Sequence, residues 1–270
     1  MKTLLKTVFL LLASVNVASH ACGQVAAHST DTTQKKLQIA TFPKPKGPKA
    51  ITKEMSIGFR LNSDGWSIYA DRGKVKPIDM KRSDMFHNVR LWQIEFTEKK
   101  NPKEYKSTSV DGSGTNTYVY GKINNFYALK LGWGYRKMLA GKPDPGTVSI
   151  HWVNTGGLAI GFLKPYYLNV YSDPAAIKYS DATKQDFLNQ SLIEGNAGFS
   201  KGIGEVKIVP GFHFKSAIHF DFSTNKKNVI GIETGFNVEY YTTAVQLMAN
   251  QPAVPYFADL FLALQFGKRW

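Results

Sequence analysis

The sequence predicts an all-β fold: an antiparallel transmembrane β-barrel of about eight strands, preceded by a signal peptide and a flexible lead-in. Three observations lead to this prediction. Apolar and polar side chains alternate in repeated segments of about ten residues, the pattern of strands with two different faces. The last segment keeps this alternation as far as the aromatic Trp270. The first residues have the pattern of an export signal.

Residues 1–23 are predicted to be a cleavable signal peptide. Lys2 and Lys6 supply positive charge, and the apolar run 8–15 that follows is too short to cross a bilayer as a helix. Small residues around Ala21 offer a cleavage site. Cys22, the single cysteine, lies at this junction. It is either lipidated after cleavage or left as a simple thiol, and in both cases the mature fold has no disulfide.

Residues 24–52 are predicted to be a flexible periplasmic segment. They are polar, and lysines alternate with prolines in the run 43–49. Prolines at this density disfavour a paired strand or a helix, because each lacks a backbone N–H and has a fixed φ. The barrel itself is expected over 53–270.

Segments in the first half of the barrel region show the two-residue period of strands. Each has large apolar side chains on one face and small or polar ones on the other. The apolar faces are Met55, Ile57, Phe59 and Leu61; Trp66, Ile68 and Ala70; Trp92, Ile94 and Phe96; and Tyr127, Leu129, Leu131, Trp133 and Tyr135. The sequence 62–65 between the first two segments has the composition of a hairpin turn.

The second half continues this pattern with more polar inner faces. One apolar face follows 148–162, and three more follow 208–222, 230–240 and 260–266. Opposite them lie charged residues such as Lys215, His219 and Glu233. The total is about eight strands, the smallest size of bacterial barrel.

The connections leave the strand count open to ten. Long connections are expected at about 98–124, 166–204 and 241–255, with 117–121 as a possible extra strand. A short helix is a further possibility within 181–194. If both termini are periplasmic, these long segments lie on the extracellular side, the asymmetry typical of such barrels.

Composition is compatible with this class. The chain of 270 residues is 43% hydrophobic and has a formal charge of +14. Its mean hydropathy of -0.25 also suits a barrel, since a spanning strand needs apolar residues only at alternate positions. Because an exported protein rarely meets nucleic acid, we expect lipid phosphates, acidic glycans or acidic partner proteins as counter-charges, and no nucleic acid.

Together, the export signal, the alternating segments and Trp270 resemble the small outer-membrane β-barrel proteins of Gram-negative bacteria, the OmpX-like and PorT-like porin-fold group. The resemblance covers 53–270 and is architectural. It implies a location in the outer membrane, contact with its lipid, and insertion by the barrel-assembly machinery. The residues that match a C-terminal insertion signal are Leu262, Leu264, Phe266 and Trp270. Because members of the group have many roles, the fold alone selects none of them.

The inward faces predict a charge network in the lumen. An eight-stranded barrel has an interior only wide enough for side chains to fill, and charges on neighbouring strands can pair. The predicted network consists of Arg60, Lys130, Arg136, His213, Lys215, His219, Glu233 and Glu239. We expect it to plug the lumen; the alternative is a narrow gated channel along the same residues.

No catalytic, cofactor or metal site is predicted. A lipid-modifying barrel enzyme would need a Ser, a His and an acid close together. Ser149 and His151 are neighbours on one face, but a hydrogen bond between them in the lumen is the expected arrangement. His213 and His219 share a face at a separation of roughly 20 Å along an extended strand, too far apart for one ion.

A soluble lipocalin-like binding protein is the remaining alternative, because it too is a barrel of about eight strands. It would hide apolar residues inside and expose charged ones. The broad aromatic faces here favour membrane interfaces instead. We therefore expect a structural or scaffold protein, not an enzyme. Its loops or tail would contact an envelope protein partner of the secretion or barrel-assembly machinery, or lipid phosphates.

Overall fold

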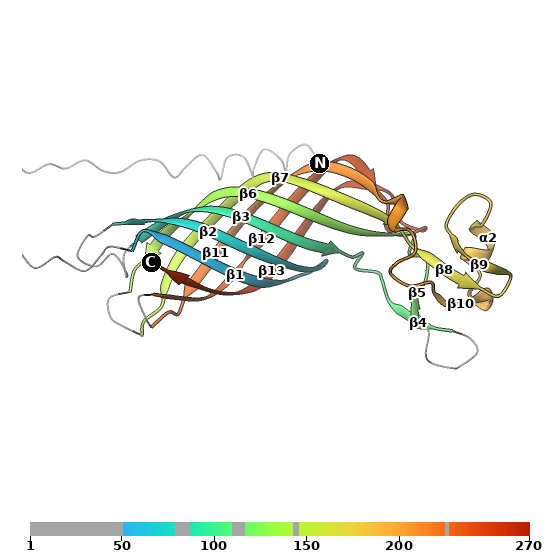
Figure 1. Ribbon diagram of the computed structural model, residues 1–270, viewed down its shortest axis with the longest axis horizontal. Coiled ribbons are helices and arrows are strands. Elements are labelled where there is room, and N and C mark those ends of the chain that lie inside the picture. Colours follow the sequence, from blue (N-terminus) through green and yellow to red (C-terminus); the bar gives the residue numbers. More distant parts are fainter. Residues whose placement is uncertain (1–50, 79–86, 110–116, 143–145, 225–226) are drawn as a thin grey trace, which may run out of the picture. The chain divides into compact units, whose positions relative to one another are not determined.

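The computed structural model describes residues 51–78, 87–109, 117–142, 146–224 and 227–270. Its main element is a closed barrel with the strand order β1-β13-β12-β11-β7-β6-β3-β2 (Figure 1). The barrel strands are β1 (Lys53–Asn62), β2 (Gly65–Pro77), β3 (His87–Lys99), β6 (Asn124–Ala140), β7 (Ser149–Pro165), β11 (Lys207–Asp221), β12 (Asn228–Val245) and β13 (Val254–Arg269). The predicted all-β barrel of eight strands is confirmed. The predicted signal peptide, and the predicted lead-in as far as residue 50, lie outside the described residues.

The barrel closes where its first and last strands pair. All neighbouring barrel strands are antiparallel, and β1 pairs with β13 from Glu54↔Arg269 to Asn62↔Phe261. At the end of this seam the N–H groups of Thr52 and Lys53 donate to the Trp270 carbonyl over 3.0 and 2.9 Å. Because a closed sheet has no free edge, its backbone polar groups are satisfied without water, as hydrocarbon surroundings require.

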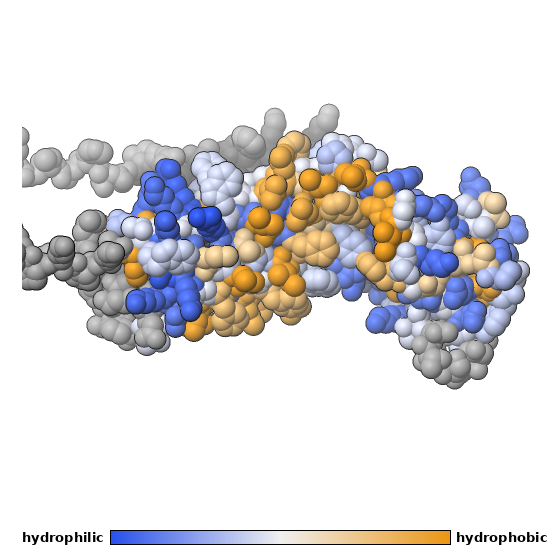
Figure 2. Space-filling model, viewed as in Figure 1, coloured by the Kyte–Doolittle hydropathy of each residue, from blue (hydrophilic) through white to orange (hydrophobic). Residues whose placement is uncertain are grey.

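The two faces of every barrel strand differ as the sequence predicts. On β1 the side chains of Met55, Ile57, Phe59 and Leu61 point outward and are exposed, while the residues between them are buried. Outward apolar side chains of neighbouring strands meet in register; Ile57, for example, lies opposite Phe266. They form an apolar band around the visible face of the barrel, with hydrophilic residues beyond both of its edges (Figure 2). This arrangement is the opposite of the lipocalin-like alternative.

The long connections form a second, smaller structure, here called the loop module. It contains two small sheets, with the orders β10-β8-β9 and β4-β5. Its elements are β4 (Lys106–Thr108), β5 (Thr117–Val119), β8 (Tyr167–Val170), β9 (Asp173–Lys178), α2 (Lys184–Phe187), η1 (Gln190–Leu192), β10 (Ile193–Asn196) and η2 (Ile203–Glu205). The possible extra strand at 117–121 is therefore real but does not belong to the barrel. The helix considered within 181–194 is present as α2.

The loop module has an apolar core, like that of a domain folded in water. Its buried members are Tyr118, Ile123, Tyr166, Leu168, Val170, Ile177, Phe187 and Ile193. It is attached to the barrel end through backbone hydrogen bonds, among them Ile123 N–H to the Leu247 carbonyl over 2.8 Å. We call this end of the barrel the loop rim, and the end that holds Lys53 and Trp270 the terminal rim. Among the described residues, none of the helices has the length and apolar character needed to cross a bilayer.

Candidate functional site: the charged interior of the barrel

Every residue of the predicted charge network lies inside the barrel, and none is more than 6% exposed. Their inward direction follows from the strand period. Arg60 lies on β1, Lys130 and Arg136 on β6, and the remaining members on β11 and β12. Buried charges are tolerated only when they are paired and hydrogen-bonded, so the contacts of each group decide what this interior can do.

The central part of the network surrounds Arg60. Its Nη1 donates to Glu95 Oε2 over 2.7 Å, and its Nη2 lies 3.8 Å from Glu233 Oε1. Lys215 Nζ donates to the same Glu233 oxygen over 2.8 Å, and Lys130 Nζ lies 2.7 Å from Glu95 Oε1. Five strands of the barrel contribute to this cluster, so it ties opposite walls together.

Aromatic rings hold the Arg60 guanidinium in place. Its central carbon lies 4.6 Å from the ring centre of Tyr69 and 4.3 Å from that of Phe261, distances typical of cation–π contacts. The close packing of Tyr69 depends on a glycine of β1, because a Cβ at Gly58 would lie 2.2 Å from the tyrosine ring. A small residue on one strand thus makes room for a ring on the next.

Toward the loop rim the network continues through Lys99. Its Nζ donates to Asp64 over 3.0 Å and to Asp259 over 2.5 Å, and lies 3.3 Å from Glu239. Glu239 also accepts from Lys130 over 2.8 Å, which joins this part to the central cluster.

An aromatic layer covers this part of the network. Phe126 packs edge-on against Tyr241 with ring centres 4.9 Å apart and stacks on Phe257 at 5.5 Å. The Tyr241 hydroxyl donates to Glu239 over 2.7 Å, so the layer is also bonded to the charges beneath it.

Near the terminal rim a second group of ion pairs closes the interior. Arg136 donates to Glu54 over 2.6 Å, and Arg269 donates to the other oxygen of Glu54 over 2.7 Å. Arg269 reaches Asp221 over 2.6 Å, and Lys142 reaches the same carboxylate over 3.1 Å.

Amide side chains extend this group toward the barrel centre. Gln93 and Gln265 donate to the two oxygens of Asp71 over 2.7 and 2.9 Å. Gln265 also accepts from Arg136 over 3.1 Å and donates to Ser56 over 2.6 Å.

The network is larger than the sequence prediction. The additional charged members are Glu54, Asp64, Asp71, Glu95, Lys99, Lys142, Asp221, Asp259 and Arg269. Most of them occupy inward positions of the same two-residue period, which is the signal that could have identified them. Lys99 was missed because β3 continues three residues past Phe96, where the predicted apolar face ends.

Three histidines near the terminal rim form a cluster of rings in tilted and edge-on contact. His151 lies between His87 and His219, with ring centres 5.5 and 6.1 Å away. None of the six ring nitrogens has a hydrogen-bond partner in the described part of the chain. The hydrogen bond expected between Ser149 and His151 is therefore wrong, because the His151 ring packs against the two neighbouring imidazoles instead.

The two histidines of the predicted charge network, His213 and His219, are both buried. His213 has Glu239 as its cross-strand neighbour, and its ring faces Gly132. His219 Nδ1 lies 3.8 Å from Glu233. Within the described ranges no group of three or more His, Cys, Asp or Glu residues has the geometry to hold a metal ion.

The residues of the expected C-terminal insertion signal lie on the outer face. Leu262, Leu264, Phe266 and Trp270 are about half exposed, at 53, 48, 58 and 54%. Their strand, β13, is paired on both sides, with β1 and with β12.

No family model and no curated protein matches this chain. Solved structures that match include Ail, the attachment invasion locus protein of Yersinia pestis, in complex with the heparin analogue sucrose octasulfate. That match has 10% identity, covers 82% of this chain and 99% of that chain, and has a TM-score of 0.37.

Two further matches are barrels of other bacteria. The N-terminal β-barrel domain of OprF from Pseudomonas aeruginosa has 7% identity, coverages of 81% and 97%, and a TM-score of 0.30. A major outer membrane protein from Thermus thermophilus has 10% identity, coverages of 81% and 99%, and a TM-score of 0.39. These values are too low to support an argument about this chain, and its fold is defined by the strand pairing given above. By that pairing, and by its apolar outside and charged inside, the chain has the architecture of a small outer-membrane β-barrel.

Proposed function

We propose that this chain is an integral outer-membrane β-barrel with a structural or scaffold role, and that charged side chains plug its lumen. The observation that carries the proposal is the burial of the interior charges. Arg60, Lys130 and Lys215 are each 1% exposed, and Glu233 and Glu239 are fully buried. The walls of a water-filled channel would be accessible to water, so this burial supports a filled interior.

The outer surface supports insertion into a membrane. Outward side chains such as Ile57, Leu131 and Leu264 are exposed and apolar, and hydrocarbon is the solvent that suits them. The predicted signal peptide 1–23 would provide export. The exposed face of β13, ending at Trp270, would be read by the barrel-assembly machinery during insertion. In this orientation the terminal rim faces the periplasm and the loop module faces the exterior.

The surfaces available to a partner are the loop module and the lead-in 24–52. The interior cations Arg60, Lys99, Lys130, Arg136, Lys142, Lys215 and Arg269 face the anions Glu54, Asp64, Asp71, Glu95, Asp221, Glu233, Glu239 and Asp259. The interior is therefore close to neutral, and the positive charge lies elsewhere on the chain. The loop-module segments 100–123 and 166–206 carry seven basic and seven acidic residues, whereas the lead-in 24–52 carries five lysines and one aspartate. The excess on the lead-in supports an acidic envelope protein or lipid phosphates as its counterpart.

The plug is tested by conductance in planar bilayers. The protein, folded in detergent, is checked by heat-modifiable gel mobility and compared with a conducting porin. We expect no channel events from this chain at any voltage at which the porin conducts. Steady single-channel steps from the folded protein would contradict the plug and favour the gated channel instead.

The scaffold role is tested by site-specific photo-crosslinking in the cell envelope. A photoreactive residue replaces the exposed Tyr105 near β4, and a matched one replaces Leu262 in the apolar band. We expect a discrete protein adduct from position 105 and only lipid adducts from position 262. Absence of protein adducts from position 105, and from positions in the lead-in, would remove the scaffold role.

A further inference from the structure

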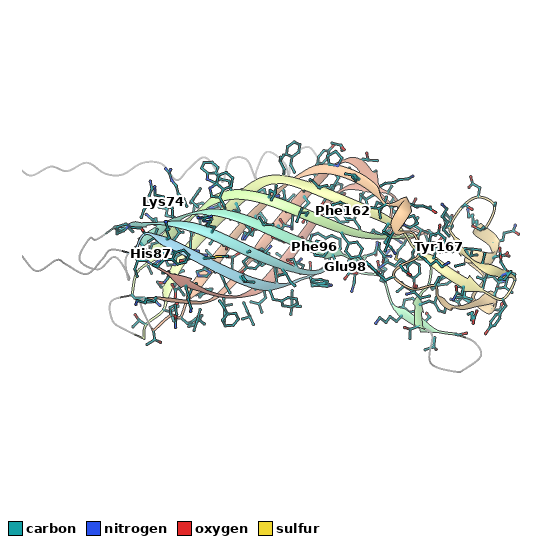
Figure 3. The ribbon with its side chains drawn as sticks, viewed as in Figure 1. Lys74, His87, Phe96, Glu98, Phe162 and Tyr167 are labelled. Atoms are coloured by element: carbon teal, nitrogen blue, oxygen red, sulfur yellow. The ribbon has the colours of Figure 1, made fainter. Side chains whose placement is uncertain are left out.

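A basic pocket lies on the outside of the barrel at the terminal rim. It has a volume of about 450 Å³, and its wall includes Lys53, Arg72, Lys74 and Arg90 together with Trp92 and Trp133. Lys74 lies on the outer side near this end of the barrel (Figure 3). All four cations are exposed, and no carboxylate lines the pocket. In the part of the chain that the structure describes, none of them forms an ion pair.

Strand pairing arranges these side chains in rows. Lys53 of β1, Lys74 of β2 and Arg90 of β3 lie directly opposite one another, forming a row of three cations near the rim. Like charges in such positions repel, which destabilises the sheet unless an anion lies between them. The row therefore has the character of an anion site.

The next two rows change from polar to apolar. Arg72 lies opposite Trp92, and Trp92 lies opposite Trp133 with ring centres 6.5 Å apart. One row further from the rim, Ile94 lies opposite Leu131, and both are exposed. Cation, aromatic ring and aliphatic side chain thus follow one another along the barrel wall, in the order of phosphate, interface and acyl chain in a lipid leaflet.

We propose that this pocket binds the phosphate of an anionic phospholipid of the periplasmic leaflet. The cations of the first row and Arg72 contact the phosphate, the tryptophans lie at the level of the lipid backbone, and the acyl chains follow Ile94 and Leu131. Arginine and lysine suit this ligand because they donate charge-assisted hydrogen bonds to phosphate oxygens. The inference rests on the proposed membrane-spanning barrel and adds to it a specific lipid site.

Charge complementarity and the adjoining apolar row select a lipid over free phosphate. An inorganic ion would use only the cations, whereas a phospholipid also covers the exposed tryptophans and the aliphatic residues beside them. Elsewhere along the same rim, Phe222 and Ile230 are apolar, and Lys137 and Lys268 are single outward lysines that do not form a row of paired cations.

The test uses the full chain folded in a zwitterionic detergent. Binding of short-chain phosphatidylglycerol is followed by tryptophan fluorescence, with phosphatidylcholine and inorganic phosphate as comparison ligands. The test variant is Arg72→Gln with Lys74→Gln. The control variant is Lys137→Gln with Lys268→Gln, which removes the same charge from exposed outward lysines that do not line the pocket.

We expect the test variant to bind phosphatidylglycerol at least tenfold more weakly than the unchanged chain. The control variant should stay within about twofold of it, because two charges away from the pocket add little at moderate salt. Phosphatidylcholine and inorganic phosphate should both bind the unchanged chain more weakly than phosphatidylglycerol does.

Three results would overturn the site. An unaltered test variant would show that the pocket does not bind the lipid, and equal losses in both variants would reduce the effect to overall charge. Inorganic phosphate binding as tightly as the lipid would make this a simple anion site. Heat-modifiable gel mobility, measured for each variant, reports separately on the barrel itself, so failure of the lipid site and failure of the proposed function give different results.

Discussion

The barrel and the loop module differ in what they bury: the barrel interior contains many charged side chains, whereas the core of the loop module is apolar. The barrel buries Arg60, Glu95 and Glu233 and exposes aliphatic side chains, whereas the loop module buries Leu168 and Phe187. The difference follows from the solvent that each part is built to meet. In hydrocarbon the apolar face belongs outside, and a charged interior is acceptable because every strand edge is paired.

Burial alone therefore does not mean that a side chain is apolar. Water drives apolar groups of the loop module together, but it gives no such force between the lipid-facing side chains of the barrel. The barrel interior also contains apolar clusters, with buried side chains such as Val89, Leu91 and Val153. Its charged groups, however, are specified by ion pairs, which are sensitive to the loss of one partner. The two regions should therefore respond differently to the same kinds of substitution.

The largest effect is expected from breaking the central ion cluster of the barrel. Arg60→Met leaves Glu95 and Glu233 buried without one of their cations, so we expect a loss of about 3–5 kcal/mol in the free energy of unfolding. Urea unfolding in lipid vesicles, followed by tryptophan fluorescence, measures this. Adding Glu95→Gln to the variant should recover part of the loss.

Lys100→Met is the matched control for that substitution. Lys100 Nζ lies 3.5 Å from Glu98, and its side chain is 47% exposed. An exposed pair is worth less than about 1 kcal/mol. If Arg60→Met cost no more than this control, the buried pairs would not be what holds the barrel interior.

A second test applies one substitution to both regions. Leu168→Ala leaves a cavity in the core of the loop module and should cost about 3 kcal/mol there. Leu264→Ala removes the same atoms from the lipid-facing surface, where acyl chains fill the space, and should cost only about 1–2 kcal/mol. Hydrogen exchange of 166–196 measures the first, and urea unfolding measures the second. A larger loss at Leu264 than at Leu168 would contradict the contrast between the two interiors.

A smaller change in the free energy of unfolding, a gain instead of a loss, is expected from a substitution in the cluster of three histidines. His151→Phe keeps a ring between His87 and His219 but removes two buried nitrogens without hydrogen-bond partners among the described residues. We expect a gain of about 1 kcal/mol in unfolding free energy. His151→Gln, which keeps polar atoms and loses the ring, should give no gain. Destabilisation by His151→Phe would mean that the imidazole nitrogens have partners that matter.

The smallest effect concerns an exposed group of the loop module. Hydrogen bonds from Lys178 and Tyr167 to Glu205 lower the pKa of that carboxyl below its ordinary value of 4.5. Tyr167 belongs to β8, beyond the loop rim (Figure 3). A lowered pKa means that the stabilisation is present above about pH 4.5 and is lost as the pH falls through the folded-state pKa. Amide exchange around β8, β9 and η2 should quicken slightly on acidification.

Glu205→Gln is the control for this pH effect. The variant keeps a side chain of the same size but has no carboxyl to titrate, so exchange around η2 should not change over the same acidic range. A pH dependence equal to that of the unchanged chain would assign the effect to another group.

Much of the barrel could be read from the sequence because a strand in a bilayer has a strict period of two. That period identified the outward residues of β1, β6 and β13 and the inward positions of Arg60 and Glu233. The hairpin at 62–65 was predicted from its turn-forming residues. The period could not give the ends of strands, and so Lys99, at the end of β3, was missed as a member of the network.

The structure of the loop module and the pairing of side chains inside the barrel could not be predicted in the same way, because both depend on contacts between residues far apart in the sequence. The strand at Thr117–Val119 pairs with β4 rather than joining the barrel, and no local signal distinguishes these outcomes. Similarly, His151 was expected to bond Ser149, its neighbour on the strand, but its ring packs against His87 from another strand.

The sequence by itself determined which face of each barrel strand is apolar, because side-chain direction alternates with residue number whatever the neighbours are. Only the tertiary structure decided which charges meet, such as Arg136 with Glu54 across the closed sheet, and which cations share the pocket at the terminal rim. Those contacts are fixed by strand order and register, which bring together residues far apart in the chain.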